Sequence, residues 1–411
     1  MSKIDELIEK LCPNGVPYMK IKEIGQVKMC KRIMKSDTNN VGGVPFYKIG
    51  TFGKKADSFI SEEKFNEYRK QYSYPKKGDI LISCSGTIGR IVVFDGEPAY
   101  FQDSNIVWLE HDGTKVTNEY LKYVYATQPW KISTGGTIAR LYNDNILDTK
   151  IAVPPLEVQD EIVHVLDDFM LLSAELSAEL KARQKQYEYY RDELLTFKNE
   201  KYEYMTLGEI ATDMYRGNGI KRTDVTETGI PCVRYGEIYT SYNVTFKECI
   251  SHTDESIISS KKYFEHGDVL FAITGESVDE IGKSIVYLGN NKCLAGGDMV
   301  VMKHNQNPKY MAYVLSTTQA QMQKSKGKVK SKVVHSSVPD LKEISIPIPP
   351  LEVQEKVANM LERFDKLCND ITEGLPAEIE ARQKQYEYYR DKLLTFKELG
   401  NEWVFKFSIS L

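Results

Sequence analysis

The chain has 411 residues, too many for one ordinary hydrophobic core, so two or more domains are expected. Its composition, 41% hydrophobic and 27% charged, is typical of a soluble globular protein, and no apolar run approaches the roughly 20 residues that span a bilayer. The net charge of −4 is concentrated in residues 156–198 and 351–397, and the remainder carries a small positive excess, so charge alone does not indicate a nucleic-acid partner.

The beginning of the chain and its cysteines point to the cytoplasm. Residues 1–10 are charged throughout, which is unlike a secretory signal. The seven cysteines are scattered and contain no Cys-x-x-Cys pair. We therefore expect neither a zinc site nor a disulfide framework, and a reducing, cytoplasmic setting.

In chain order, the first predicted elements are strands. The Gly78-Asp79 turn precedes a strand at 80–83, and residues 91–94 form another short β-branched run. One helix is expected at about 117–128. Pro154-Pro155 then ends the strand pattern and begins a helix.

A long helix is predicted over residues 154–199, where apolar residues recur at a 3–4 spacing. Ser173 and Arg183 are the two imperfect positions of this heptad stripe. The stripe contains Ile162, Leu166, Phe169, Leu176, Leu180, Tyr187, Tyr190, Leu194 and Phe197. About 40 helical residues extend roughly 60 Å, which is long enough to separate two domains.

The second half of the chain repeats this plan. Strands are predicted at 269–272 and 299–302, and a helix at 308–323. A second heptad stripe follows over 349–397, interrupted by four extra residues between Phe364 and Arg382, where Gly374 and Pro376 both lie. We expect a kink or a break of the helix there.

The chain is a tandem duplication. Residues 182–198 and 381–397 differ at one of 17 positions, Glu193 against Lys392, and the motif PPLEVQ stands at 154–159 and again at 349–354. The regions between have diverged almost beyond alignment. We therefore predict an α+β fold with two different β-rich domains on a common helical frame. The segments are domain 1 (1–153), helix 1 (154–199), domain 2 (200–348), helix 2 (349–397) and a tail (398–411).

The two apolar stripes need partners. Pairing them as an antiparallel coiled coil with pseudo-twofold symmetry buries both stripes and places one domain near each end. The alternative is that each stripe packs onto its own domain as an ordinary amphipathic helix. Domains of this size do not need helices of that length, which favours the coiled coil.

Identical residues off the stripe occur in both helices, and this repeated surface suits two copies of one partner. The docking candidates are Gln184, Lys185, Glu188, Tyr189, Arg191, Gln383, Lys384, Glu387, Tyr388 and Arg390. A recent duplication without selection on this surface is the alternative. The much greater divergence of the two domains weighs against it.

The repeated PPLEVQ, RQKQYEYYRD and LLTF motifs, each closing a variable domain, resemble those of the specificity subunits of type I restriction–modification systems. The resemblance covers nearly the whole chain. It implies two target-recognition domains that each read one half of a bipartite, asymmetric site in double-stranded DNA, with the helices setting the gap. It further implies two adenine-N6 methylation subunits on the helices and restriction subunits that join them. S-adenosylmethionine, ATP and Mg would then belong to those partners. Residues 398–411 resemble an abortive third domain, unlike a usual ending of this family.

The strongest local sign of DNA contact is a row of lysines at alternate positions: Lys324, Lys326, Lys328, Lys330 and Lys332. On an extended segment they would share one face and could follow the phosphates. The alternative is a solvated edge strand whose lysines prevent aggregation. The corresponding residues 135–140 are far less basic, so we expect the two halves to grip DNA differently.

Other candidates are polar or basic residues in predicted loops: Lys48, Ser83, Ser85, Thr87, Arg90, Gln102, Asn105, Arg140 and Arg234. Lys48 and Arg234 occupy matched positions and could reach phosphate or guanine, or equally form a surface salt bridge. The loop at 83–90 could meet base edges. The loop at 102–105 could do so too, or serve as a capped turn.

No catalytic motif accompanies these residues. The sequence lacks a phosphate-binding Gly-x-x-x-x-Gly-Lys-Ser/Thr loop, an Asn-Pro-Pro-aromatic methyltransferase motif and His-Glu-x-x-His. Ser83-Cys84-Ser85-Gly86 lacks the first glycine of a hydrolase elbow. We expect a non-catalytic DNA reader without a metal or cofactor of its own. The alternatives are a stand-alone nuclease or methyltransferase, and a coiled-coil scaffold that binds without DNA preference.

Overall fold

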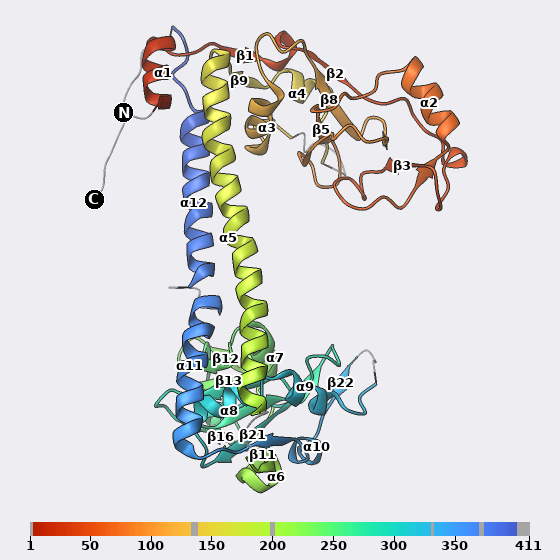
Figure 1. The fold of residues 1–411 in the computed structure, drawn as a ribbon. Helices are drawn as coiled ribbons and strands as arrows, with labels where there is room; N and C mark the ends of the chain where they lie inside the picture. The colour runs from red at the N-terminus through yellow and green to blue at the C-terminus, as the bar shows by residue number, and fades with distance from the viewer. Residues whose placement is uncertain (1–2, 133–138, 198–201, 330–332, 370–373, 401–411) are drawn as a thin grey trace. The chain divides into compact units, whose positions relative to one another are not determined.

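The structure is a computed structural model that describes residues 3–132, 139–197, 202–329, 333–369 and 374–400. These residues form two compact units. Unit 1 comprises residues 1–174 and 381–411, and unit 2 comprises residues 175–380. Each unit therefore contains one β-rich domain together with helix segments from both repeats (Figure 1).

The β-rich domain of unit 1 contains short strands and a few helices. The elements are α1 (Lys3–Leu11), β1 (Tyr18–Lys20), β2 (Gln26–Lys28), β3 (Val44–Tyr47), β4 (Phe59–Ile60), α2 (Glu62–Gln71), β5 (Ile80–Ser83), β6 (Ile91–Val93), β7 (Tyr100–Phe101), β8 (Ile106–Glu110), α3 (Asn118–Ala126), α4 (Asn143–Leu147) and β9 (Lys150–Ala152). The strands form sheets in the orders β2-β8-β5-β6, β4-β3-β7 and β1-β9.

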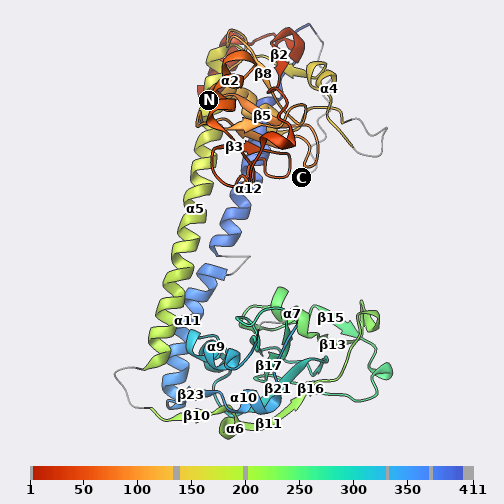
Figure 2. The same cartoon turned by 90° about the vertical axis from the view of Figure 1, so that its right-hand side faces the viewer.

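The β-rich domain of unit 2 is built on the same plan with additional strands (Figure 2). The elements are β10 (Tyr204–Thr206), α6 (Leu207–Ile210), β11 (Ala211–Arg216), β12 (Val225–Thr226), β13 (Ile230–Val233), α7 (Tyr235–Thr240), β14 (Thr245–Phe246), β15 (Ser251–Thr253), β16 (Tyr263–Phe264), β17 (Val269–Ala272), β18 (Thr274–Gly275), β19 (Ser284–Tyr287), β20 (Cys293–Ala295), β21 (Met299–His304), α8 (Pro308–Val314), α9 (Thr318–Ser325), β22 (Val334–His335), α10 (Val338–Lys342) and β23 (Ser345–Pro347).

The strand orders show that the two domains share one topology despite their divergent sequences. In unit 2 the sheets run β11-β21-β17-β19-β14, β12-β15-β13-β20-β16, β10-β23 and β18-β22. The parallel pair β13·β20 repeats the parallel pair β3·β7 of unit 1. The antiparallel pair β10·β23 likewise repeats β1·β9. The predicted duplication therefore extends to the β-rich regions.

The predicted turns and strands are confirmed, and one helix is corrected. Gly78 and Gly267 have φ of +93° and +89°, a left-handed conformation that glycine adopts without strain, and each precedes a predicted strand. The helix expected over 308–323 is instead two helices, α8 and α9. The second helix begins at Thr318 and is capped by Thr317, whose side chain accepts a hydrogen bond from the backbone N–H of Ala320.

The long helices occur where the heptad stripes predict them. Helix α5 (Leu156–Thr196) has 41 residues. The second stripe forms α11 (Leu351–Asn369) and α12 (Leu375–Leu394), so the break expected beside Gly374 is confirmed.

The two stripes pair with each other in both units. In unit 1, Phe169 of α5 stacks on Tyr389 of α12, with ring centroids 5.3 Å apart. In unit 2, Tyr190 of α5 stacks on Phe364 of α11 at 6.3 Å. A later residue of α5 thus pairs with an earlier residue of the second repeat, which is the antiparallel order. Phe169 and Phe364 are equivalent, as are Tyr190 and Tyr389, so the same contact is made twice with the repeats exchanged.

The helix stripes also pack onto the β-rich domains. In unit 1, Ile162 and Leu166 are fully buried in a core that includes Leu393 of the other repeat. In unit 2, Leu361 is buried in a core that includes Tyr187 and Leu195. The alternative that stripes pack only on their own domains is therefore wrong, because each domain contacts helix residues from both repeats.

A buried glutamine fastens each helix to its domain. Gln159 is fully buried; its side-chain oxygen accepts from the N–H of Thr117 (3.0 Å), and its amide nitrogen donates to the carbonyls of Lys115 and Pro154 (both 2.8 Å). Thr117 is the N-cap residue of α3. Gln159 therefore joins the start of α5 to the start of α3.

Gln354 makes the equivalent connection in unit 2. It is also fully buried, it accepts from the N–H of Asn307, the N-cap residue of α8, and it donates to the carbonyl of Pro349. The repeated PPLEVQ motif thus encodes a structural joint.

None of the helices in the described part of the chain combines the length and apolarity needed to cross a membrane.

We predict that Gln159→Leu destabilises unit 1 by about 3 kcal/mol, because the N–H of Thr117 and the carbonyls of Lys115 and Pro154 lose their fully buried partner. Trp108 and Trp130 both lie in cores of unit 1, so in a Trp403→Phe background tryptophan fluorescence during urea unfolding follows that unit. The midpoint should fall for Gln159→Leu and remain unchanged for Glu157→Leu, an exposed position on the same helix. Equal midpoints for both variants would contradict the role of the joint.

Candidate nucleic-acid interface

A polar cavity of about 470 Å³ lies in unit 1 beside the ends of β3 and β7. It is lined by Arg32, Ile33, Lys35, Thr38, Asn40, Phe46, Lys48, Ser58, Gln102, Asp103, Ser104 and Asn105. Three cationic side chains and several amide and hydroxyl groups therefore surround one recess. These are the groups that contact phosphates and base edges in DNA complexes.

The parallel pairing of β3 and β7 places two predicted residues at one edge. Both strands end on the same side, so Lys48, which follows β3, lies near Gln102, which follows β7. The side-chain oxygen of Gln102 accepts from the N–H of Ile49 (3.0 Å), which holds the amide in place. Lys48 forms a half-exposed ion pair with Asp57 at 2.8 Å. A cation in such an exposed pair can exchange its partner at little cost.

The loop after β7 gathers three further candidates. Ser85 donates from its hydroxyl to the side-chain oxygen of Asn105 (2.8 Å). The guanidinium of Arg140 donates to the carbonyl of Ser104 (2.7 Å). Ser104 has a φ of +53°, so the loop turns sharply at this point. Ser85 and Arg140, which are distant in sequence, thus bind two residues that line the cavity, Asn105 and Ser104.

Two predicted contacts in the neighbouring loop have structural roles instead. Ser83 is 1% exposed and its hydroxyl donates to the carbonyl of Thr87, so it cannot meet a base edge. Arg90 donates to the carbonyl of Phe52 at 2.9 Å. Thr87 is exposed at the tip of this loop and remains available. The polar sequence pattern did not distinguish hydroxyls that close the loop from those that face solvent.

Arg32 is a site residue that the sequence analysis missed. Its Nε donates to the carboxylate of Asp103 at 2.9 Å, and its side chain is 67% exposed. No local sequence pattern marked it, because Arg32 lies 14 residues after Tyr18 whereas Arg216 lies 12 residues after Tyr204, so the two arginines do not occupy matched positions.

Unit 2 has a related edge at the ends of β13 and β20. Arg234 follows β13 as Lys48 follows β3, but its guanidinium is held by Glu237 (Nε to Oε1 2.8 Å), which is only 5% exposed. The salt-bridge alternative therefore describes Arg234. Arg216, at the end of β11, is 61% exposed and pairs with Asp298 in the loop after β20.

The predicted lysine row is not one extended face. Lys324 belongs to helix α9 and shares its buried side with Ala320, four residues earlier. Its ammonium donates to the carbonyl of Leu315 (2.7 Å) and the hydroxyl of Ser284 (3.1 Å) and is 4% exposed, so it cannot contact DNA. The alternating lysines suggested an extended segment, although Lys324 lies in a helix.

The other members of the row differ among themselves. Lys326 is exposed just after the helix, and Lys328 forms an ion pair with Asp340 at 2.8 Å. Lys330 and Lys332 lie outside the described residues.

The docking candidates on the helices fall into two groups. Tyr189 and the equivalent Tyr388 are 64% and 62% exposed. Five charged and amide residues beside them are also exposed: Lys185, Glu188, Gln383, Lys384 and Glu387. Gln184 is half-buried. Arg191 and Arg390, by contrast, fold back onto the adjacent Asp192 and Asp391, and their side chains are only 12% and 20% exposed. The first group can form a docking surface.

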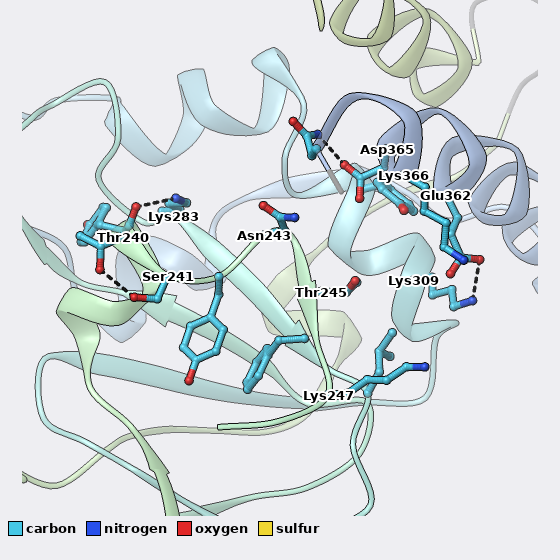
Figure 3. Close-up of a pocket in the computed structure, with 16 residues that line it drawn as sticks. Thr240, Ser241, Asn243, Thr245, Lys247, Lys283, Lys309, Glu362, Asp365 and Lys366 are labelled. Carbon is cyan, nitrogen blue, oxygen red and sulfur yellow. Dashed lines mark hydrogen bonds and ion pairs between the residues drawn. The ribbon is translucent and has the colours of Figure 1, made fainter. Parts of the chain in front are cut away.

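In unit 2 this helix surface adjoins a larger polar recess of about 760 Å³ (Figure 3). Lys283 lies here with its ammonium 3.1 Å from the carbonyl of Tyr239, and Lys309 pairs with Glu362 at 2.8 Å. A neighbouring recess of about 400 Å³ is lined by Gln184 and Glu188 and shares Lys283 with the larger one. Mixed charges that already pair with one another suit a protein contact better than a run of phosphates.

Comparison with known proteins identifies the family. The family model of the type I restriction modification DNA specificity domain matches twice, at residues 13–183 and 199–381. A Haemophilus influenzae protein described as a type I restriction enzyme specificity subunit is 57% identical over 179 residues, which cover 43% of this chain and 46% of that relative. The Escherichia coli EcoR124I/EcoR124II specificity subunit is 32% identical over 295 residues, 69% of this chain and 72% of that relative.

A solved chain from a study of assembly and conformational transition in the type I restriction–modification system has a similar fold. Its TM-score is 0.64 at 15% identity, and the match covers 93% of this chain and 98% of that chain. At this identity the likeness supports the fold alone.

We predict a pH-dependent contribution of Lys324 to stability. Burial and, to a smaller extent, the charge of Arg191 together lower the pKa of Lys324 from 10.5 to about 7. Between these values the unfolded chain binds more protons than the folded one, so the unfolding free energy should rise as the pH increases from 7 to 10.

The test compares the wild type with Lys324→Met by urea unfolding monitored by circular dichroism. The stability of the wild type relative to this variant should increase across that pH range. The difference in stability between the wild type and Lys326→Met, a variant at an exposed position, should not change with pH. A constant difference between the wild type and Lys324→Met at every pH would contradict the prediction.

Proposed function

Because the chain belongs to the family of type I restriction–modification DNA specificity subunits, we propose that it is a non-catalytic reader in which each β-rich domain recognises one half of a bipartite DNA site. The observation that carries this proposal is the contrast between the parts of the chain. Two domains of one topology have diverged in sequence, whereas the helices that support them share the PPLEVQ motif and a segment that differs at one of 17 positions. Two different readers on a common frame require this pattern.

The chemistry of the domain edges supports contact with DNA. In unit 1, Lys48, Asn105 and Arg140 combine cations with an amide and lie beside one cavity or its mouth. Cations supply affinity through the phosphates, and amide and guanidinium groups discriminate bases in the major groove. The edge of unit 2 offers Arg216, with Lys326 as a further exposed cation of that domain.

The repeated helix surface suits two identical partners. Tyr189 and Tyr388 present large exposed rings in equivalent surroundings, and exposed aromatic residues are common anchors of protein interfaces. We assign this surface to two methylation subunits, with restriction subunits joining the complex. S-adenosylmethionine, ATP and Mg would be bound by those partners.

Exchange of residues 17–150 for the first domain of another family member tests the reading of half-sites. The chimera and the wild type would each be co-expressed with the methylation subunit, and methylated adenines would be mapped by methylome sequencing. One half of the target should change and the other should remain the same. Changes in both halves would contradict modular reading, and sequence-independent methylation would favour a scaffold without DNA preference.

A paired insertion tests the helices as the spacer. One heptad added after Ala174 in α5 and one added after Glu380 in α12 keep both stripes in phase and lengthen the frame by about 10 Å. The gap between the half-sites should grow by about three base pairs, at about 3.4 Å each, with both half-sites unchanged. A heptad in α5 alone should abolish sequence-specific methylation. An unchanged gap in the double insertion would refute the spacer role.

A further inference from the structure

Each β-rich domain carries an exposed arginine that pairs with an aspartate, through Nε in Arg32 and through a terminal nitrogen in Arg216. In unit 1, Arg32 pairs with Asp103, and in unit 2, Arg216 pairs with Asp298. Arg32 lies four residues after β2, and Arg216 ends β11, the equivalent strand. Asp103 lies in the loop after β7, and Asp298 lies in the loop after β20. The arrangement recurs although almost no sequence is shared around it.

The backbone beneath Arg32 is fixed on both sides. Cys30 and Ile33 are 2% and 8% exposed and belong to one hydrophobic core, so the intervening residues are directed outward. Arg32 also lines the cavity that contains Gln102 and Asn105. Its guanidinium therefore stands at a rigid, polar recess.

The backbone beneath Arg216 is fixed by different means. Gly217 donates from its N–H to the carbonyl of Met299 (2.9 Å). A Cβ at Gly217 would lie only 2.1 Å from the carbonyl oxygen of Gly296, so no other residue fits there. This close approach joins the end of β11 to the loop that carries Asp298. The backbone is thus fixed in different ways beneath the two arginine–aspartate pairs.

Stability does not account for these pairs. The arginine side chains are 67% and 61% exposed, and exposed ion pairs contribute little to folding. A guanidinium has five N–H donors in a planar fork. In the described residues the side chain of Arg32 makes one hydrogen bond, from Nε to Asp103, so both terminal nitrogens face outward without a protein acceptor.

We propose that Arg32 and Arg216 each read a guanine, one in each half-site, and that Asp103 and Asp298 are positioning residues that orient the fork. Guanine presents O6 and N7 as two acceptors in the major groove, and a bidentate arginine matches them. In Arg32 the carboxylate occupies Nε and leaves both terminal nitrogens for the base. In Arg216 it occupies one N–H of a terminal nitrogen, and the other N–H groups of the fork are left for the base. This assignment rests on the proposed function and adds the base class and the residue to it.

The experiment uses the complex of the full chain with its methylation subunit and duplexes that carry the site mapped for the wild type. Each guanine is replaced in turn by adenine or by 7-deazaguanine, which lacks the N7 acceptor. For the wild type, one guanine in each half-site should weaken binding about 5- to 150-fold on replacement by adenine. Arg32→Ala and Arg32→Lys should lose that discrimination in one half only, and Arg216→Ala in the other half only.

Matched variants separate base reading from charge and from folding. Lys31→Ala removes a neighbouring exposed cation; it should weaken binding evenly for every duplex and reduce the salt dependence by about one phosphate contact. With Arg32→Ala, the 7-deazaguanine duplex should cause no further loss, because both changes remove the same contact. Asp103→Asn should reduce discrimination less than Arg32→Ala.

Distinct outcomes overturn the two proposals. If the wild type recognises a bipartite site and Arg32→Ala retains its full base preference with a normal unfolding transition, the arginine assignment is wrong. The proposed function is not affected by this result. If the wild-type complex shows no sequence preference, the proposed function itself fails.

Discussion

The burial of helix residues from one repeat in the core of the other repeat's domain is the constraint on which this architecture depends. Leu393 lies in a core with Ile162 and the strands of domain 1, and Leu195 lies in a core with Leu361 and the strands of domain 2. Neither repeat alone therefore contains a complete unit. A change at a helix end alters the packing of the opposite domain, which explains why the helices have stayed alike while the domains diverged.

In each domain, the face that packs against the helices is held by equivalent contacts. In α3, Tyr120 is fully buried and donates from its hydroxyl to the carbonyl of Ala152; in α8, Tyr310 is fully buried and donates to the carbonyl of Pro347. The buried glutamine of each PPLEVQ motif then fixes the same helix start. Packing and polar satisfaction concentrate on this face, so the edge at the ends of β3 and β13 is free to vary in charge and shape. Divergence there does not disturb the frame.

The sequence predicted the parts of the fold that are periodic or repeated, and it failed where one side chain's surroundings decide its role. The heptad pattern predicted α5 and the break before α12, because an apolar stripe along a long helix is buried when it pairs with a second such helix. Alternating lysines misled, since Lys324 lies four residues after Ala320 on a buried helix face, a relation that the period-two pattern hides. Arg32 was missed because its significance comes from Asp103, 71 residues away. Contacts between loops that are distant in sequence leave no local pattern.

The same pairing of charges explains how an acidic chain can suit a DNA-reading role. Lys48 lies against Asp57, Lys328 against Asp340, and Arg32 against Asp103. Free cations would add attraction to any phosphate backbone, and this sequence-independent attraction competes with the target because non-specific sites vastly outnumber it. A cation in an exposed pair must exchange its partner before it binds a phosphate, which lowers the gain slightly. Under the proposed function, binding would then depend more on groups whose geometry matches a base, and the aspartates would favour specificity over affinity.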